Sequence, residues 1–202
     1  MKESTFKLIR TVLLIMLIAG CSLIVVKINV DEVRKDAIRE KLKSESEADG
    51  KGTTGYFSSF ELSTSDGGSF TEKNLSDFRV NVINCWGNTC PSCIREMPFL
   101  QELYDEYKEK GLQVVGVSAD TVSLDYSDDD YETARKIIVD NGVTYPCLFA
   151  DSRFDSEVFD LLNGALPGTF FTDAQGNVIR FVAGSHSKEE WTEMFNEVLS
   201  LY

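Results

Sequence analysis

Histidine is nearly absent from this sequence: His186 is the only one among 202 residues. A cysteine hydrolase needs a base beside its nucleophile, and nothing in the sequence places His186 near a reactive cysteine. A structural zinc site needs about four ligands. Besides one Cys-x-x-Cys pair, the candidates are Cys85, Cys147 and His186, at no recognisable spacing. The scarcity of histidine therefore disfavours both classes of site, and we expect no bound metal.

Basic residues are also in deficit. Lys and Arg number 20 against 33 Asp and Glu, so the formal net charge is −13. Such a surface disfavours nucleic acid and anionic lipid headgroups as partners. The densest acidic run, residues 125–132, lacks the glycine that a calcium-binding EF-hand loop carries at its sixth position. We therefore interpret this run as a solvated loop that caps the helix after it.

A long apolar run occurs at the N-terminus. Residues 11–26 are uncharged and follow several basic residues, as in an export signal or a membrane anchor. The segment 18–21 (Ile-Ala-Gly-Cys) resembles a bacterial lipobox, which predicts cleavage before Cys21 and lipidation of that cysteine. The apolar residues continue beyond Cys21, however, and an uncleaved run approaches the about 17 residues that a spanning helix needs. Residues 1–26 are therefore predicted to be a lipoprotein signal or a transmembrane anchor. Either one places the remainder outside the cytoplasm, attached to the cytoplasmic membrane by its N-terminus.

The chain after this run divides into two parts. Residues 27–55 are charged and then rich in Ser and Gly, which predicts a flexible tether that has room for a short amphipathic helix within 31–43. Residues 56–202 have the size of one domain with its own core. We find no internal repeat.

The Cys-x-x-Cys motif lies between a strand-like and a helix-like segment. Residues 79–86 alternate apolar and β-branched side chains, 87–89 break that pattern, and apolar side chains recur at helical spacing after Cys93. Two cysteines in the first turn of a helix share one face and can close a disulfide. Unpaired N–H groups and the dipole at the helix start stabilise a thiolate at Cys90. This placement predicts thiol-disulfide exchange in which Cys90 attacks and Cys93 resolves the mixed disulfide. A purely structural disulfide is the alternative.

The elements around the motif predict an α/β fold. A buried strand is expected at 112–118, so that strand, helix and strand form a parallel βαβ unit. The later elements expected are a helix at 131–141, an extended piece at 145–149, a short helix at 154–162, a hairpin of 169–172 and 177–182, and a last helix after Ser187, whose capping-box partner is Glu190.

This order of elements is the thioredoxin-like pattern, and two segments carry a closer resemblance. Residues 84–98 (NCWGNTCPSCIREMP) resemble the active-site segment of the TlpA-like thiol-disulfide oxidoreductases, and residues 165–173 (ALPGTFFTD) resemble their cis-proline loop. The resemblance extends from about residue 57 to the C-terminus. It implies a thioredoxin-like fold, with a central mixed sheet flanked by helices, carried on an N-terminal membrane anchor.

The resemblance also implies roles for individual residues. Cys90 and Cys93 would be the redox-active disulfide, Pro167 would be a cis-proline that faces it, and Trp86 would frame the site with Pro167. Neither a metal nor an organic cofactor is implied. The implied partners are proteins with disulfides or dithiols, together with a redox partner protein that supplies electrons. The direction of electron flow does not follow from the motif.

The chain departs from the family pattern at two places. Thr89 stands where the family usually has an aromatic residue, directly before the first cysteine. Asn84 stands where thioredoxin itself has a buried carboxylate that helps to deprotonate the second cysteine. Because an amide cannot accept a proton, Cys93 needs water or another carboxylate. Glu96 is the nearest candidate in sequence, although a glutamate on a helix can equally face solvent.

The remaining cysteines, Cys85 and Cys147, fall in predicted extended segments. A bridge between them is conceivable in an oxidising compartment, but sequence does not establish proximity. We expect both to be buried free thiols.

Three functional alternatives remain. Cytochrome c maturation is a narrower version of the same chemistry, because the CPSC motif is similar to that of those specialists. A peroxidase is disfavoured, since it would carry a threonine three residues before its reactive cysteine and this chain has Gly87 there. The non-enzymatic alternative is a tethered thioredoxin-like binding module whose disulfide is only structural.

Overall fold

The computed structural model describes residues 32–38, 40–41, 55–121, 128–162 and 164–202. The chain divides into two compact units, Met1–Glu40 and Lys41–Tyr202. Residues 32–38 of the first unit are helical, inside the segment expected to have room for a short helix. The predicted anchor, Cys21 and most of the predicted tether lie outside the described residues. Within the described ranges, no helix is long and apolar enough to cross a membrane.

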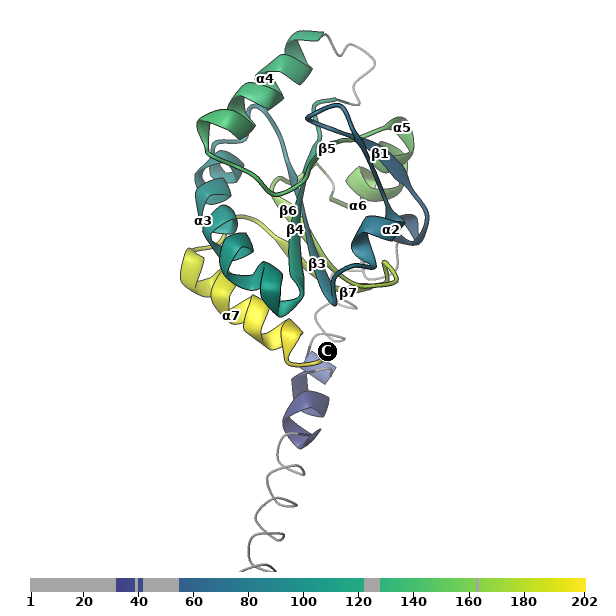
Figure 1. The fold of residues 1–202 in the computed structure, drawn as a ribbon, viewed down its shortest axis with the longest axis vertical. Coiled ribbons are helices and arrows are strands. Elements are labelled where there is room, and N and C mark those ends of the chain that lie inside the picture. Colours follow the sequence, from purple (N-terminus) through teal and green to yellow (C-terminus); the bar gives the residue numbers. More distant parts are fainter. Residues whose placement is uncertain (1–31, 39, 42–54, 122–127, 163) are drawn as a thin grey trace, which may run out of the picture. The chain divides into compact units, whose positions relative to one another are not determined.

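The second unit is built on a mixed sheet of seven strands in the order β2-β1-β5-β4-β3-β6-β7 (Figure 1). The strands are β1 (Glu61–Thr64), β2 (Ser69–Thr71), β3 (Val80–Trp86), β4 (Leu112–Ser118), β5 (Cys147–Phe149), β6 (Gly168–Asp173) and β7 (Val178–Ala183). The pairs β3–β4 and β4–β5 are parallel, and the other pairs are antiparallel. The central mixed sheet predicted from the sequence is confirmed.

The βαβ unit around the motif forms the centre of this sheet. β3 and β4 are rich in β-branched residues and buried along their whole length, as strands covered on both faces must be. They pair in register from Val80 opposite Leu112 to Trp86 opposite Ser118. Helix α3 (Pro91–Tyr107) connects them, and β4 has the bounds predicted from the sequence.

Helices cover both faces of the sheet (Figure 1). One face carries α3, α4 (Asp128–Asp140) and α7 (Lys188–Leu199), and the other carries α2 (Glu72–Leu75), α5 (Ser152–Phe154) and α6 (Asp160–Leu162). The single helix predicted at 154–162 is instead interrupted: a π-helical segment, Asp155–Phe159, separates α5 from α6.

Each face of the sheet has its own set of buried side chains, because successive residues of a strand point to opposite sides. The face toward α2, α5 and α6 is covered by one apolar cluster, which consists of Tyr56, Phe57, Phe60, Leu62, Phe70, Leu75, Ile83, Cys85, Val115, Val117, Leu148, Ala150, Phe154, Val158, Leu162, Phe170 and Phe181. On the α3 and α7 face, Phe171, Trp191 and Phe195 pack together with ring centroids 6.0 to 6.3 Å apart.

The hairpin of β1 and β2 was not predicted. Its strands have four and three residues, with one buried side chain each, Leu62 and Phe70. The turn between them is closed by a hydrogen bond from the Gly68 N–H to Thr64 Oγ1 at 2.7 Å. Strands this short carry too little alternation to be recognised from sequence.

Candidate active site

Helix α3 begins at the redox motif. Cys90 is the N-cap residue, with an extended backbone, and Pro91 occupies the first helical turn, where its missing N–H leaves no bond unmade. Cys90 and Cys93 form a disulfide with an S–S distance of 2.04 Å and a Cα–Cα distance of 5.3 Å. The backbone N–H of Cys93 donates to Cys90 Sγ at 3.3 Å. The helix start thus directs an N–H donor at the sulfur whose thiolate it would stabilise.

The two cysteines differ in accessibility. Cys93 is fully buried, whereas Cys90 is half-buried and lies beside Ser92, with its Sγ 3.4 Å from Ser92 Oγ. Cys90 is therefore accessible from outside the domain, and Cys93 is not. This difference suits Cys90 for the exchange with a partner and Cys93 for the step inside the protein.

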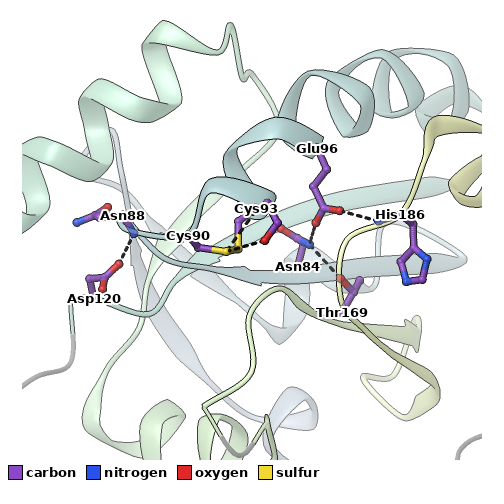
Figure 2. Close-up of a disulfide and its surroundings, with 9 residues drawn as sticks. Asn84, Asn88, Cys90, Cys93, Glu96, Asp120, Thr169 and His186 are labelled. Atoms are coloured by element: carbon purple, nitrogen blue, oxygen red, sulfur yellow. Dashed lines mark hydrogen bonds between the residues drawn. A yellow bond between two sulfur atoms is a disulfide. The ribbon is translucent and has the colours of Figure 1, made fainter.

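Asp120, directly after β4, holds the loop that precedes the motif (Figure 2). Its carboxylate accepts a hydrogen bond from the Asn88 backbone N–H, and Asn88 Nδ2 donates to the Asp130 carbonyl in the first turn of α4 at 3.1 Å. A Cβ atom at Gly87 would lie 3.0 Å from Asp120 Oδ2 and 3.2 Å from Leu166 Cδ1. The close approach of these segments therefore favours glycine at position 87. Asp120 was missed in the sequence, where the only signal is its place at the carboxyl end of a parallel strand.

The Leu166–Pro167 peptide bond is cis, as the resemblance implied. Gly168, the next residue, pairs with Cys85, so Pro167 lies at the end of β3 from which the motif continues. The Pro167 carbonyl accepts a hydrogen bond from the Gly184 N–H at 2.8 Å, which ties the start of β6 to the end of β7. A part for Pro167 in substrate binding stays a prediction.

A buried carboxyl group lies one helical turn beyond Cys93 (Figure 2). Glu96 is 1% exposed; its Oε1 accepts from Asn84 Nδ2 at 3.0 Å, and its Oε2 accepts from the His186 backbone N–H at 3.2 Å. Asn84 Nδ2 also donates to Thr169 Oγ1 on β6 at 3.0 Å. The alternative in which Glu96 faces solvent is thereby excluded. β3, α3 and the loop before α7 thus meet at this carboxyl, and β6 is joined to it through Asn84.

The surroundings of Glu96 bring its proton affinity into the neutral range. Burial raises the pKa of Glu96 from 4.5 to about 7, and the hydrogen bonds from Asn84 and His186 oppose that rise. Cys93 and Glu96 stand at positions i and i+3 of α3, which places them on the same face of the helix. Glu96 can therefore take up and release a proton near neutral pH, which Asn84 cannot.

Trp86 lies beneath the motif in the core. It is 1% exposed, and it adjoins Gly116, where an added Cβ would lie 3.3 Å from each of Trp86 Nε1, Cys147 Sγ and Tyr145 Cε2. Trp86 can thus support the motif only from inside the domain. It contributes almost nothing to the surface of the domain.

Cys85 and Cys147 are buried free thiols, as expected. Cys85 pairs with Val117 and Cys147 with Gly116, so the two thiols point to opposite faces of the sheet. The sheet therefore prevents a disulfide between Cys85 and Cys147. For the same reason, the two thiols cannot bind the same metal ion. Burial raises the pKa of both thiols, that of Cys147 to about 12, which leaves them protonated and unreactive at neutral pH.

An open pocket of about 420 Å³ adjoins the motif; it is lined by Ser92, Arg95, Glu96, Phe99, Ser185, His186 and Ser187. Phe99, at the edge of this pocket, is 39% exposed. Because Glu96 forms part of its wall, the pocket offers a route for protons between this carboxyl and solvent. His186 was considered in the sequence only as a ligand or a base. Its backbone N–H, rather than its imidazole, bonds to Glu96.

Comparisons with protein-family models and with curated proteins found similar proteins. A model of the AhpC/TSA family matches residues 56–181. The thiol-disulfide oxidoreductase ResA of Geobacillus kaustophilus is 34% identical over 122 residues, which cover 59% of this chain and 64% of that protein. ResA of Bacillus thuringiensis is 28% identical over 126 residues, 61% of this chain and 67% of that protein. The resemblance to TlpA-like proteins is confirmed, although the match spans only about two thirds of either relative.

Solved structures share the fold. A thiol:disulfide interchange protein of the thioredoxin family from Chlorobium tepidum superposes with a TM-score of 0.56 at 24% identity, over 70% of this chain and 93% of that one. A secreted Mycobacterium tuberculosis disulfide oxidoreductase gives a TM-score of 0.53 at 19% identity, over 68% and 94% of the two chains. At these identities the likeness concerns the fold, and the predicted thioredoxin-like fold is confirmed.

Proposed function

The chain belongs to the AhpC/TSA family, and from this premise we propose that it is a thiol-disulfide oxidoreductase that acts on disulfides of partner proteins. The observation that carries the proposal is the accessible N-cap position of Cys90 in a disulfide with the buried Cys93. The names of the ResA relatives support it. No metal or organic cofactor takes part in the proposed reaction.

The reaction proceeds in two exchange steps. In the reduced protein, the Cys90 thiolate attacks one sulfur of a substrate disulfide; a bond forms between them, the substrate disulfide breaks, and the leaving sulfur takes up a proton. Cys93 then attacks Cys90 Sγ, the intermolecular bond breaks, and the second substrate sulfur leaves as a thiol. The substrate gains two electrons and two protons, and Cys90–Cys93 is oxidised. A dithiol partner protein restores the reduced pair, and the reverse sequence oxidises a substrate.

Glu96 serves the second step as a proton acceptor. Cys93 attacks as a thiolate, and a thiol buried in the domain needs a nearby base to lose its proton. Glu96 lies on the same helix face, one turn away, and burial raises its pKa to about 7. The pocket beside Ser92 then lets the proton pass from Glu96 to solvent.

The surface around Cys90 selects the partner. Thr89 is exposed directly before Cys90, and the cis Leu166–Pro167 bond lies at the same end of β3. An extended substrate segment would bind along this cis-proline loop with its disulfide sulfur at Cys90. A small polar residue at position 89 leaves this rim less apolar than an aromatic residue would.

We also propose that the domain is tethered to the outer side of the cytoplasmic membrane through residues 1–26. The apolar run after basic residues supports this location, and the lipobox-like segment offers Cys21 as a lipid attachment site. Labelled palmitate incorporated into the full-length chain but not into a Cys21→Ala variant would identify a lipid anchor. Membrane retention without label in either protein would identify a transmembrane anchor.

Reduction of insulin disulfides tests the proposed activity. The wild-type protein, supplied with a dithiol reductant, should accelerate the reaction, and Cys90→Ser should reduce the rate to that of the reductant alone. Cys85→Ala, which removes a buried thiol from the opposite face of the sheet, should retain the activity. Equal rates for wild type and Cys90→Ser would reject the assignment.

A further inference from the structure

The loop between β7 and α7 contributes a single described hydrogen bond to Glu96. The donor is the backbone N–H of His186, at 3.2 Å from Oε2. A backbone donor has no rotamer of its own, so its position depends on what holds the loop. The neighbouring residue, Ser187, is the N-cap of α7.

A complete capping box fastens this loop. The Ser187 backbone N–H donates to Glu190 Oε2 at 2.8 Å, and Ser187 Oγ accepts from the Glu190 N–H at 3.3 Å. Two successive N–H groups, those of His186 and Ser187, therefore point at two different carboxylates. Only the φ and ψ angles of His186 separate these two rigid peptide groups, so fixing the second restricts the orientations open to the first.

Packing against α7 fastens the same loop from its other side. The His186 ring contacts the Trp191 ring edge-on, with centroids 5.2 Å apart, and Trp191 is fully buried. Among the described residues, the Trp191 indole N–H has no hydrogen-bond partner. The loop thus has little freedom to move relative to the carboxyl.

The polar and titratable groups near Glu96 come from its own helix, from β3 and β6, and from the segments that precede β5 and α7. Cys93 lies on the same helix as Glu96. Tyr145 lies before β5, and the negative charge of Glu96 contributes to a raised pKa of the Tyr145 hydroxyl. Asn84, on β3, donates to Glu96 and to Thr169 on β6, and neither Asn84 nor Thr169 carries a charge. In the loop before α7, Glu190 Oε2 lies 3.9 Å from His186 Nδ1. His186 therefore lies near two carboxyl groups, those of Glu96 and Glu190.

We propose that Ser187 and Glu190 are positioning residues for Glu96: their capping box holds the His186 N–H on the carboxyl while Cys93 carries out its step. This inference rests on the proposed function for its chemical meaning. The structural part of the inference, that the exposed capping box positions the buried Glu96 carboxyl, does not depend on catalytic activity. Without the box, the N–H drifts from Oε2 and the ionised form of Glu96 loses a donor.

The ordinary alternative is that the box only stabilises α7, as N-caps do in general. The chain contains a matched control. Thr71 caps α2 with the same kind of box, in which its N–H donates to Asn74 Oδ1 at 2.8 Å. That helix packs on the opposite face of the sheet, so Thr71→Ala removes a comparable cap without touching Glu96.

The test is a titration of the Glu96 carboxyl by carbon-13 NMR in the oxidised full-length protein, with the signal assigned by Glu96→Gln. We expect a midpoint near 7 in the wild type. Ser187→Ala should raise it by about half a unit or more, because an anion loses a hydrogen-bond donor. Thr71→Ala should leave it unchanged, and Ser187→Thr, which keeps a capping oxygen, should restore it. Equal midpoints for Ser187→Ala and Thr71→Ala would overturn the proposal.

A second pair of variants decides the matter if Ser187→Ala does not fold. Glu190→Gln removes the charge but keeps an oxygen that accepts from the Ser187 N–H, whereas Glu190→Ala removes both. The Glu96 midpoint should be higher in Glu190→Ala than in Glu190→Gln, and equal values would again overturn the proposal. Because the readout is a carboxyl signal, failure here leaves the insulin assay and the proposed activity intact. Failure of that assay would in turn leave the positioning result standing.

Discussion

Both faces of the central sheet bury aromatic rings, but the buried carboxyl group of Glu96 lies on the face toward α3 and α7. The face toward α2, α5 and α6 is a continuous apolar cluster rich in aromatic rings, in which Phe57, Phe170 and Phe181 adjoin one another. The face toward α3 and α7 buries Asn84, Thr169 and Glu96 in one hydrogen-bonded group below the disulfide. Neighbouring residues of a single strand thus belong to different environments.

This difference separates stability from chemistry. Burial of apolar side chains drives folding and requires no particular geometry of donors and acceptors. A buried carboxyl, in contrast, costs free energy and is tolerated where hydrogen bonds compensate for part of that cost. Apolar side chains on both faces therefore stabilise the domain, whereas the buried carboxyl on the α3 and α7 face tunes the reaction. Substitutions on the two faces should have separable effects.

The largest difference is expected between two fully buried cysteines. Cys93→Ala should lower insulin reduction by at least about a hundredfold, because the mixed disulfide at Cys90 cannot be resolved. That covalent adduct should accumulate and be visible on a non-reducing gel. Cys85→Ala removes the same side chain from the apolar face and should keep nearly full activity. A comparable loss of insulin reduction in Cys93→Ala and Cys85→Ala would show that the two faces do not differ in their part in the reaction.

Glu96→Gln should affect the reaction to an intermediate degree. The amide keeps the size of the side chain but cannot accept the Cys93 proton, so resolution of the mixed disulfide should slow by at least about tenfold. The loss should be greatest above pH 7, where Glu96 is ionised in the wild type. Stopped-flow measurement of the resolving step between pH 6 and 9 checks this. Glu102→Gln, at an exposed position of the same helix, serves as the control.

The same carboxyl predicts a dependence of stability on pH. The pKa of Glu96 is raised from 4.5 to about 7 in the folded protein, so the folded state binds the proton more tightly than the unfolded state. The free energy of unfolding should therefore fall as pH rises from about 4.5 to about 7, by about 3 kcal/mol at most. Glu96→Gln should lack this decline in urea titrations of the oxidised protein. If the unfolding free energies of wild type and Glu96→Gln changed with pH in the same way, Glu96 would have an ordinary pKa.

The smallest effects should come from adjacent phenylalanines of β6. Phe170 faces the apolar cluster and Phe171 faces Trp191 and Phe195, and both are fully buried. Substitution of either by Leu should cost about 1–2 kcal/mol of unfolding free energy. Only Phe171→Leu should also shift the Glu96 titration, since it loosens the packing of α7. A shift in both variants would mean that the two faces are coupled through the sheet.

Local patterns predicted most of the elements that surround the motif. β4 has the expected bounds, the capping box at Ser187 is present, and the hairpin of β6 and β7 lies where it was expected. These features depend on a few neighbouring residues. The β1–β2 hairpin and the π-helical segment Asp155–Phe159 were missed, because such short or irregular segments are held by tertiary packing rather than by periodicity.

The site was only partly predictable for the same reason. Cys90, Cys93 and the cis-proline follow from local sequence and its resemblance to a family. The setting of Glu96 depends on Asn84 and His186, which lie 12 and 90 residues away. One signal was available: Glu96 falls on the buried stripe of α3 with Cys93, Met97 and Leu100. An acidic residue on an apolar stripe marks a buried acid that needs an explanation.

A redox titration of the Cys90–Cys93 pair tests the central claim most directly. The fraction of oxidised protein would be measured by thiol alkylation in glutathione and dithiothreitol buffers at pH 7. A catalytic pair should titrate between about −120 and −280 mV, the range of thiol-disulfide exchange proteins. A disulfide that stays oxidised to potentials below about −300 mV would behave as a structural bridge, and the proposed function would then be wrong.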